Sequence, residues 1–227
     1  YDKETGIARY SAAVEKPSYT YATGSSAVSL TVSFSLDMST MPKSPFTDVV
    51  AGSWYFDAAL YASSHNLMLG TSPTEFSPNI TMTRGMLVTV LYRMNGSPSV
   101  SGKTPFTDVR TDEWYSAAVL WAYQNGIVTG MSDTTFDPIN NVTREQMATI
   151  LFRYTKTAAP DKAKASADLS GFADAGSVND WAVDAMRWAV GQKLIAGITL
   201  EQSVYLQPRG NATRAQAATV LTRYYAQ

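Results

Sequence analysis

The sequence predicts a mainly α-helical fold of three helix-loop-helix repeats, preceded by a short β segment. Three observations support this. A helix with arginine in its first turn occurs three times, a proline stands at one fixed spacing before each arginine, and a Phe-x-Asp opening recurs. The three sets are Arg84, Arg144 and Arg214; Pro78, Pro138 and Pro208; Phe46, Phe106 and Phe172. Such self-similarity indicates an array of supersecondary units that share a core.

The middle arginine helix has the clearest start signal. Thr143 is a good N-cap because its hydroxyl can accept an unpaired N–H of the first turn, and Gln146 can return a bond to the cap. Arg144 needs another explanation, because a cation there lies against the positive end of the helix dipole. The apolar residues at helical spacing that define a buried face are Met147, Ile150, Leu151 and Tyr154.

Each repeat follows the same order of signals. A tryptophan after the Phe-x-Asp opening precedes an amphipathic helix, a glycine-containing link follows, and the proline leads into the arginine helix. We expect Gly126 to end the first helix of the middle repeat as a left-handed C-cap. The predicted repeats span residues 45–95, 105–155 and 171–227.

Residues 1–44 have a different pattern. Apolar residues between Val28 and Leu36 alternate with Ser and Thr, which predicts a half-buried strand. We expect this segment to be the end of a preceding β-domain or a strand-rich connector. Because the chain starts at Tyr1, without Met or a signal peptide, we interpret it as a fragment or a mature form.

The composition narrows the classes of function. Charged residues make up 16% of the chain against about 25% in typical globular proteins, and the net charge is −1. Neither nucleic acid nor an acidic membrane is therefore an expected partner. With no cysteine and one histidine, disulfides are excluded and we expect neither a metal site nor a cofactor. No apolar run approaches the ~20 residues that would insert across a membrane.

The motifs in order, Phe-x-Asp-Val, Trp, Gly-Ile-Val-x-Gly, Thr-Phe-x-Pro and Thr-Arg, resemble the S-layer homology repeat. The resemblance covers three copies from about Phe46 to the C-terminus. It implies a pseudo-three-fold helical prism that anchors an exported protein non-covalently to the bacterial cell wall or S-layer. It further implies that grooves between neighbouring repeats bind secondary cell-wall polysaccharide, typically one bearing pyruvylated N-acetylmannosamine. Cargo would then be carried by a domain upstream of Tyr1.

Four residue types match the family's motifs, and the resemblance implies a ligand-binding role for them. They are Arg84, Arg144 and Arg214; Trp54, Trp114 and Trp181; Asp48, Asp108 and Asp174; Gly70, Gly130 and Gly197. For the arginines we favour contact with a sugar carboxylate, aided by free N–H groups at the helix start. The tryptophans fit a core position as well as stacking on a sugar ring. The aspartates fit a pairing with the arginines or a cap of the turn before Trp, and the glycines fit a role in backbone geometry.

The repeats depart from the family's usual Thr-Arg-Ala-Glu. Met86, Gln146 and Gln216 stand at its acidic position, and Met cannot cap a helix. The third repeat also lacks the Gly-based turn before Pro208. We therefore expect the second repeat to form the strongest groove, with Arg144 contributing most to affinity. We also expect the arginines to be partly exposed, so that removal of Arg144 leaves folding intact.

Two other functions fit parts of the sequence. Glycoside hydrolysis needs two converging carboxylates, but the acids here recur with the repeats, so we do not expect an enzyme. His65 has no obvious Ser or Asp companion, and a surface or capping role is favoured. The alternative is a helical scaffold for a protein partner or peptidoglycan at the cell envelope. Its expected aromatic anchors are Tyr61, Tyr92 and Tyr123.

Overall fold

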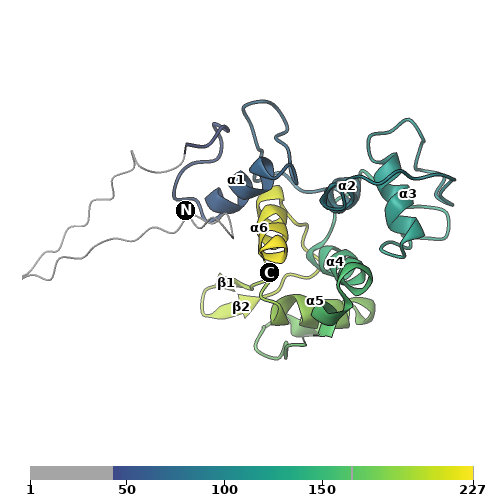
Figure 1. The fold of residues 1–227 in the computed structure, drawn as a ribbon. Helices are drawn as coiled ribbons and strands as arrows, with labels where there is room; N and C mark the ends of the chain where they lie inside the picture. Colours follow the sequence, from purple (N-terminus) through teal and green to yellow (C-terminus); the bar gives the residue numbers. More distant parts are fainter. Residues whose placement is uncertain (1–42, 165, 227) are drawn as a thin grey trace, which may run out of the picture.

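The computed structural model describes residues 43–164 and 166–226, and these are mainly helical (Figure 1). The first repeat contains α1 (Phe56–Ser64) and α2 (Arg84–Met94). The second contains α3 (Ser116–Gln124) and α4 (Arg144–Ala158), and the third contains α5 (Val183–Gly191) and α6 (Arg214–Tyr225). Short 3₁₀ turns lie at Pro160–Lys164, Ala175–Ser177 and Asp180–Ala182. The mainly helical class is confirmed. The expected β segment lies outside the described residues, apart from residues 43 and 44.

The third repeat has a hairpin where the first two have turns. Strands β1 (Ile198–Leu200) and β2 (Ser203–Tyr205) pair antiparallel, with Ile198 opposite Tyr205. Glu201, between the strands, has φ 55°, a left-handed conformation that reverses the chain without glycine. This hairpin explains how the repeat reaches Pro208 without the missing Gly-based turn.

The principal helix pairs join different repeats. Helix α3 packs on α2, α5 packs on α4, and α1 packs on α6, so the first and third repeats also meet (Figure 1). In each pair the first helix of one repeat covers the arginine helix of another. The hydrophobic face of a repeat is therefore buried by its neighbour.

Backbone hydrogen bonds join the three repeats in a closed circuit. The N–H of Met82 donates to the carbonyl of Ala212 (2.8 Å), Ala212 to Val142 (2.9 Å), and Val142 back to Met82 (2.9 Å). All three residues are buried. Because buried backbone groups need partners, each repeat depends on both others at this point.

The same circuit continues into the starts of the arginine helices. The N–H of Arg84 donates to the carbonyl of Asn140 (2.9 Å), and that of Gly85 donates to Pro138 (2.8 Å). The third N–H, of Met86, donates to the Thr83 hydroxyl. Helices α4 and α6 repeat this pattern, with the acceptor carbonyls of Gly210 and Pro208 for α4 and of Ile80 and Pro78 for α6. The recurrent prolines thus supply carbonyls that cap a helix of another repeat.

The helix caps follow the expected differences between the repeats. Thr143 with Gln146, and Thr213 with Gln216, form complete capping boxes. In the first repeat Thr83 accepts from the N–H of Met86, but Met86 returns no bond. Gly126 has φ 67° after α3, which confirms the predicted left-handed C-cap.

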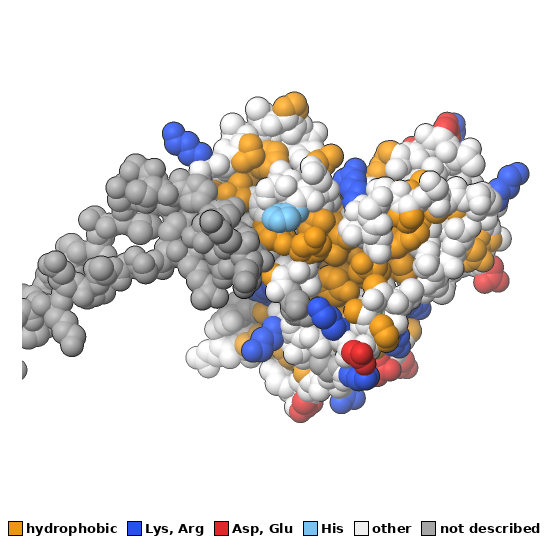
Figure 2. Space-filling model, viewed as in Figure 1, with side chains coloured by type: hydrophobic (Ala, Val, Ile, Leu, Met, Phe, Trp, Pro, Cys, Tyr) orange, Lys and Arg blue, Asp and Glu red, His pale blue; other side chains and the backbone are white. Residues whose placement is uncertain are grey.

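One hydrophobic core runs through all three repeats. On the face seen in Figure 2, hydrophobic side chains gather across the middle, and the few charged side chains are scattered toward the rim. Each repeat has one fully buried residue two positions before its proline. These residues are Phe76, Phe136 and Leu206. Within the described part of the chain, no helix has the length and apolar character needed to cross a membrane.

The incomplete cap of α2 gives a stability prediction. Met86→Gln should add the missing bond to the N-cap backbone and raise the free energy of unfolding by about 0.5–1 kcal/mol. Gln146→Met should lower it by a similar amount, because it removes the corresponding bond in α4. Urea unfolding of both variants measures these changes; a loss of stability in Met86→Gln would contradict the capping argument.

Candidate functional site: three grooves shared by the repeats

Three surface hollows have one common plan. Each is lined by a glycine and the arginine helix of one repeat, the helix-start arginine of a second repeat and the tryptophan of the third. We name them by their glycines. The Gly130 groove measures about 300 Å³, the Gly70 groove about 370 Å³ and the Gly197 groove about 440 Å³. Such volumes are at the lower end of small-ligand sites.

The grooves combine the expected residues across repeats rather than within one. The Gly130 groove contains Arg84 and Trp181, the Gly197 groove contains Arg144 and Trp54, and the Gly70 groove contains Arg214 and Trp114. The prediction that the second repeat's own residues form one groove is therefore wrong. Trp114, Gly130 and Arg144 lie in three different hollows. Sequence adjacency misled because each arginine helix inserts its start into another repeat.

The helix-start arginines are buried, not partly exposed as expected. Arg84, Arg144 and Arg214 are each only 5% exposed. Their Nε atoms donate to the carbonyls of Phe136 (2.8 Å), Leu206 (2.7 Å) and Phe76 (2.8 Å), respectively. In addition, the guanidinium groups of Arg84 and Arg214 lie over the rings of Phe136 and Phe76. A buried guanidinium that bonds a carbonyl of another repeat is part of the fold as well as of the groove wall.

The aspartates hold the same peptide segment from its other side. The Asp108 carboxylate accepts the N–H groups of Phe136 (2.9 Å) and Asp137 (2.7 Å). Asp137 has φ 58°, so these bonds stabilise a left-handed residue other than glycine. Asp48 and Asp174 make the equivalent bonds to residues 76–77 and 206–207. The aspartates therefore shape the turn before the proline, not the turn before Trp, and they line none of the three grooves.

Two interpretations of the arginines need correction. The helix-start N–H groups are not free for a ligand, because those of residues 84–86 and their equivalents are all satisfied by protein acceptors. Nor does an ion pair join these arginines to Asp48, Asp108 or Asp174 within the described residues. Their charges nevertheless act on one another. Burial lowers the pKa of Arg144 and Arg214, and Asp174 and Asp48 respectively oppose that shift.

The three predicted tryptophans are on the surface. Trp54 is 66% exposed, Trp114 57% and Trp181 54%. Trp121 and Trp188, which are not part of the motif, are buried instead. The core interpretation of the motif tryptophans is therefore wrong, and their indole faces remain available at the groove edges.

The glycines are explained by backbone geometry. A Cβ atom at Gly130 would lie 2.5 Å from the ring of Phe106 and 2.7 Å from the carbonyl oxygen of Thr135. At Gly70 it would lie 2.7 Å from the ring of Phe46. At Gly197 it would meet Val204 and Phe172. Each glycine thus lets a groove wall pack tightly on the opening Phe of its own repeat.

A second arginine in each groove was missed from the sequence. Arg93, Arg153 and Arg223 line the Gly70, Gly130 and Gly197 grooves, respectively. Arg93 and Arg223 lie in the last turns of α2 and α6, whereas α4 continues to Ala158 beyond Arg153. Their signal was present, because each follows the helix-start arginine at one constant spacing. A basic residue toward the end of a helix is also explained by the helix dipole alone, so this position does not by itself indicate a ligand.

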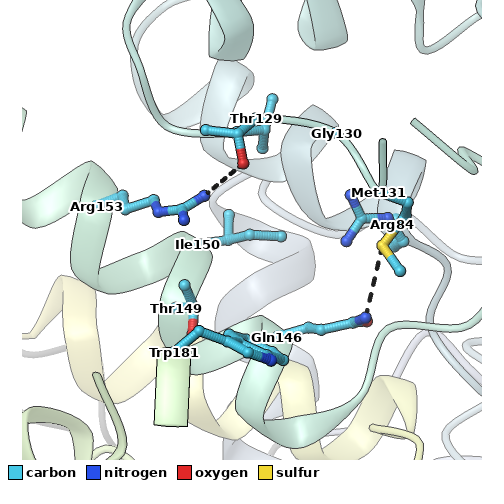
Figure 3. A pocket seen from close by; sticks show the side chains of 10 residues that line it. Arg84, Thr129, Gly130, Met131, Gln146, Thr149, Ile150, Arg153 and Trp181 are labelled. Carbon is cyan, nitrogen blue, oxygen red and sulfur yellow. Dashed lines mark hydrogen bonds between the residues drawn. The ribbon is translucent and has the colours of Figure 1, made fainter. Parts of the chain in front are cut away.

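The Gly130 groove differs from the other two in how its arginines are held (Figure 3). Arg144 and Arg214 each donate a further bond, from Nη2, to the residue before the groove glycine: Ala196 (3.1 Å) and Leu69 (2.6 Å). No such bond joins Arg84 to Thr129 or to any other described residue. Gly130 has φ 82°, whereas Gly70 and Gly197 lie outside the left-handed region. Arg84 is thus a buried residue whose Nη atoms donate to no acceptor among the described residues.

Arg153 completes this groove from the opposite end. Its Nη1 donates to the Thr129 hydroxyl (3.2 Å), and Figure 3 shows Arg153 and Arg84 extending toward one another over Ile150. Burial lowers the pKa of Arg84, Asp137 and Asp108 oppose that shift, and the charge of Arg153 lowers it further. Arginine keeps its proton in proteins, so two cations face this hollow.

Three features of the structure bear on the two rival functions. No cluster of His, Asp and Glu within residues 43–164 and 166–226 could hold a metal ion. His65 is the C-cap of α1 and stacks on Tyr61, as its capping interpretation predicts. Of the three tyrosines expected as anchors, Tyr61 is only 6% exposed and Tyr92 is half-buried, whereas Tyr123 is exposed as expected.

Burial of the helix-start arginines reverses the stability expected for Arg144. Arg144→Met keeps most of the apolar volume but leaves the carbonyls of Leu206 and Ala196 without a donor. We expect it to lower the free energy of unfolding by about 2–3 kcal/mol. Arg93→Met, at an exposed position, should change it by less than about 0.5 kcal/mol. Equal stability of the two variants in urea would contradict a structural role for Arg144.

Comparison with known proteins identifies the repeats. The S-layer homology domain model matches residues 45–85, 105–148 and 171–218, more than half of the chain. An endoglucanase of Bacillus sp. (strain KSM-635) is 33% identical over 178 residues, which are 78% of this chain and 18% of the endoglucanase. The surface-layer 125 kDa protein of Lysinibacillus sphaericus is 31% identical over 154 residues, or 68% and 12% of the two chains. This chain spans less than a fifth of either relative. It belongs to the S-layer homology domain family, with three tandem copies of the repeat.

Proposed function

We propose that this unit anchors an exported protein to the bacterial cell surface by binding an acidic cell-wall polysaccharide in its three grooves. Membership of the family and the similarity to a surface-layer protein support a location in the cell wall or S-layer. The polysaccharide we propose is a secondary cell-wall polymer with a carboxylate-bearing sugar, such as pyruvylated N-acetylmannosamine. The unit itself would not be catalytic, and a separate domain of the longer protein would be the cargo.

One observation carries the proposal: every groove pairs an exposed indole with two guanidinium groups. In the Gly197 groove, for example, Trp54 lies with Arg144 and Arg223. An indole face suits the apolar face of a pyranose ring, and a guanidinium forms charge-assisted bonds with a carboxylate. Because charged residues make up only 16% of the chain, a pair of arginines beside an exposed tryptophan is an uncommon grouping on this protein.

We further propose that the three repeats, at residues 45–95, 105–155 and 171–227, form a pseudo-three-fold prism. The closed circuit of backbone bonds among Met82, Val142 and Ala212 supports this arrangement. So does the repeated composition of the grooves, in which each repeat supplies a different element to each hollow.

Binding to cell walls tests the proposed function. The protein should sediment with walls that retain their polysaccharide and remain in solution when that polymer has been chemically removed. A variant with Trp54, Trp114 and Trp181 all replaced by Ala should bind at least about tenfold more weakly, since it loses the ring contact in every groove. These side chains are exposed, so its circular dichroism should match the parent protein. Equal binding to both wall preparations would instead indicate peptidoglycan or protein as the partner.

The acidic character of the ligand gives a separate prediction. Raising the ionic strength from about 0.1 M to about 1 M shortens the Debye length from about 10 Å to about 3 Å, so wall binding should weaken. Sedimentation across a salt series measures the effect. Binding that stays constant or strengthens would indicate a neutral ligand held by apolar contacts.

A further inference from the structure

The three grooves share a plan but not an electrostatic environment. In the Gly70 and Gly197 grooves, the helix-start arginine uses Nη2 to bond a protein carbonyl. In the Gly130 groove, the Nη atoms of Arg84 bond no described residue, although the side chain is 5% exposed. A buried guanidinium whose Nη donors lack protein acceptors is costly, and a ligand that supplies acceptors would remove that cost.

The second arginines of the three grooves differ as well. Arg153 is half-buried and tied to the Thr129 hydroxyl, a side chain on the opposite wall of the same groove. Arg223 is exposed and donates to the Leu194 carbonyl. Arg93 is exposed, and its guanidinium forms no hydrogen bond or ion pair with another described residue. A half-buried group that is already ordered loses less conformational entropy when it binds.

These observations place two cationic groups at opposite ends of one hollow of about 300 Å³. Arg84 contributes unbonded donors from a buried position, and Arg153 contributes an ordered fork (Figure 3). Bringing two such charges together is unfavourable unless an anion lies between them. Trp181 and Ile150 supply the apolar surface beside this charged site.

We propose that the Gly130 groove is the highest-affinity of the three sites, and that Arg153 is its specificity-determining residue for an anionic sugar. The anionic group would lie between Arg84 and Arg153, with the ring against Trp181. Arg93 and Arg223, at the equivalent positions, would contribute less. This inference rests on the proposed function, and it replaces Arg144 with Arg84 and Arg153 as the principal binding pair.

The equivalent arginines allow a matched test. Arg153→Ala, Arg93→Ala and Arg223→Ala are titrated with the methyl glycoside of pyruvylated N-acetylmannosamine and with polysaccharide-bearing walls. We expect Arg153→Ala to weaken the tightest site roughly ten- to hundredfold, the usual effect of losing a charge-assisted contact. Arg93→Ala and Arg223→Ala should stay within about threefold at that site. Arg153→Lys should recover part of the loss, because it restores the charge without the fork.

Tryptophan fluorescence then identifies the groove that fills first. The change at low ligand concentration should disappear in Trp181→Phe and persist in Trp54→Phe and Trp114→Phe. The neutral glycoside without the pyruvyl group should bind parent and Arg153→Ala alike.

The outcomes separate the two proposals. A larger effect of Arg93→Ala or Arg223→Ala than of Arg153→Ala, or a fluorescence change that survives in Trp181→Phe, would overturn this inference while wall binding stands. Parent protein that binds neither walls nor glycoside would overturn the anchoring function and this inference together. Thermal unfolding of each variant confirms that it is folded, which we expect for Arg153→Ala because the Arg153 side chain bonds only the exposed Thr129 hydroxyl among the described residues.

Discussion

The architecture depends on one peptide segment that is held from both sides by opposite charges. Asp108 binds the N–H of Phe136 from within the same repeat, and Arg84 binds its carbonyl from the first repeat. Leu206 and Phe76 are held in the same way, by Asp174 with Arg144 and by Asp48 with Arg214. The aspartate and arginine do not need to touch, because the polar peptide group between them completes the interaction. This arrangement explains how a buried cation at a helix start is tolerated: its charge lies beyond the helix, in the turn of another repeat.

The grooves are a consequence of the same arrangement. An arginine that reaches into another repeat brings its own helix start beside that repeat's glycine, and the third repeat supplies the tryptophan. No single repeat therefore contains a complete groove. The structural and ligand-facing roles of these arginines are not alternatives. In each, Nε bonds a carbonyl of another repeat, and in Arg144 and Arg214 Nη2 does so as well, while the same residue lines a hollow.

Local signals in the sequence were sufficient for the repeats, the caps and the glycine C-cap, because each depends on residues close in the chain. Thr143 with Gln146 and the left-handed Gly126 are examples. The partners of Arg144 could not be predicted, since they are backbone carbonyls of a distant turn, and any residue type supplies a carbonyl. For the same reason the sequence suggested free N–H groups at the helix starts. Exposure of Trp114 and burial of Trp121 follow from helix packing between repeats, which periodicity within one helix does not specify.

The contact between the last and first repeats also bears on the rate of folding. Arg214 and Phe76 are 138 positions apart in the sequence, yet they form one of the three equivalent bonds. Contacts between distant parts of a chain form slowly because the intervening chain must first lose entropy. A linear solenoid can gain stability one repeat at a time as it grows. Here the Phe76 carbonyl receives its arginine donor only when the third repeat packs against the first, so we expect closure of the three repeats to be a late step of folding.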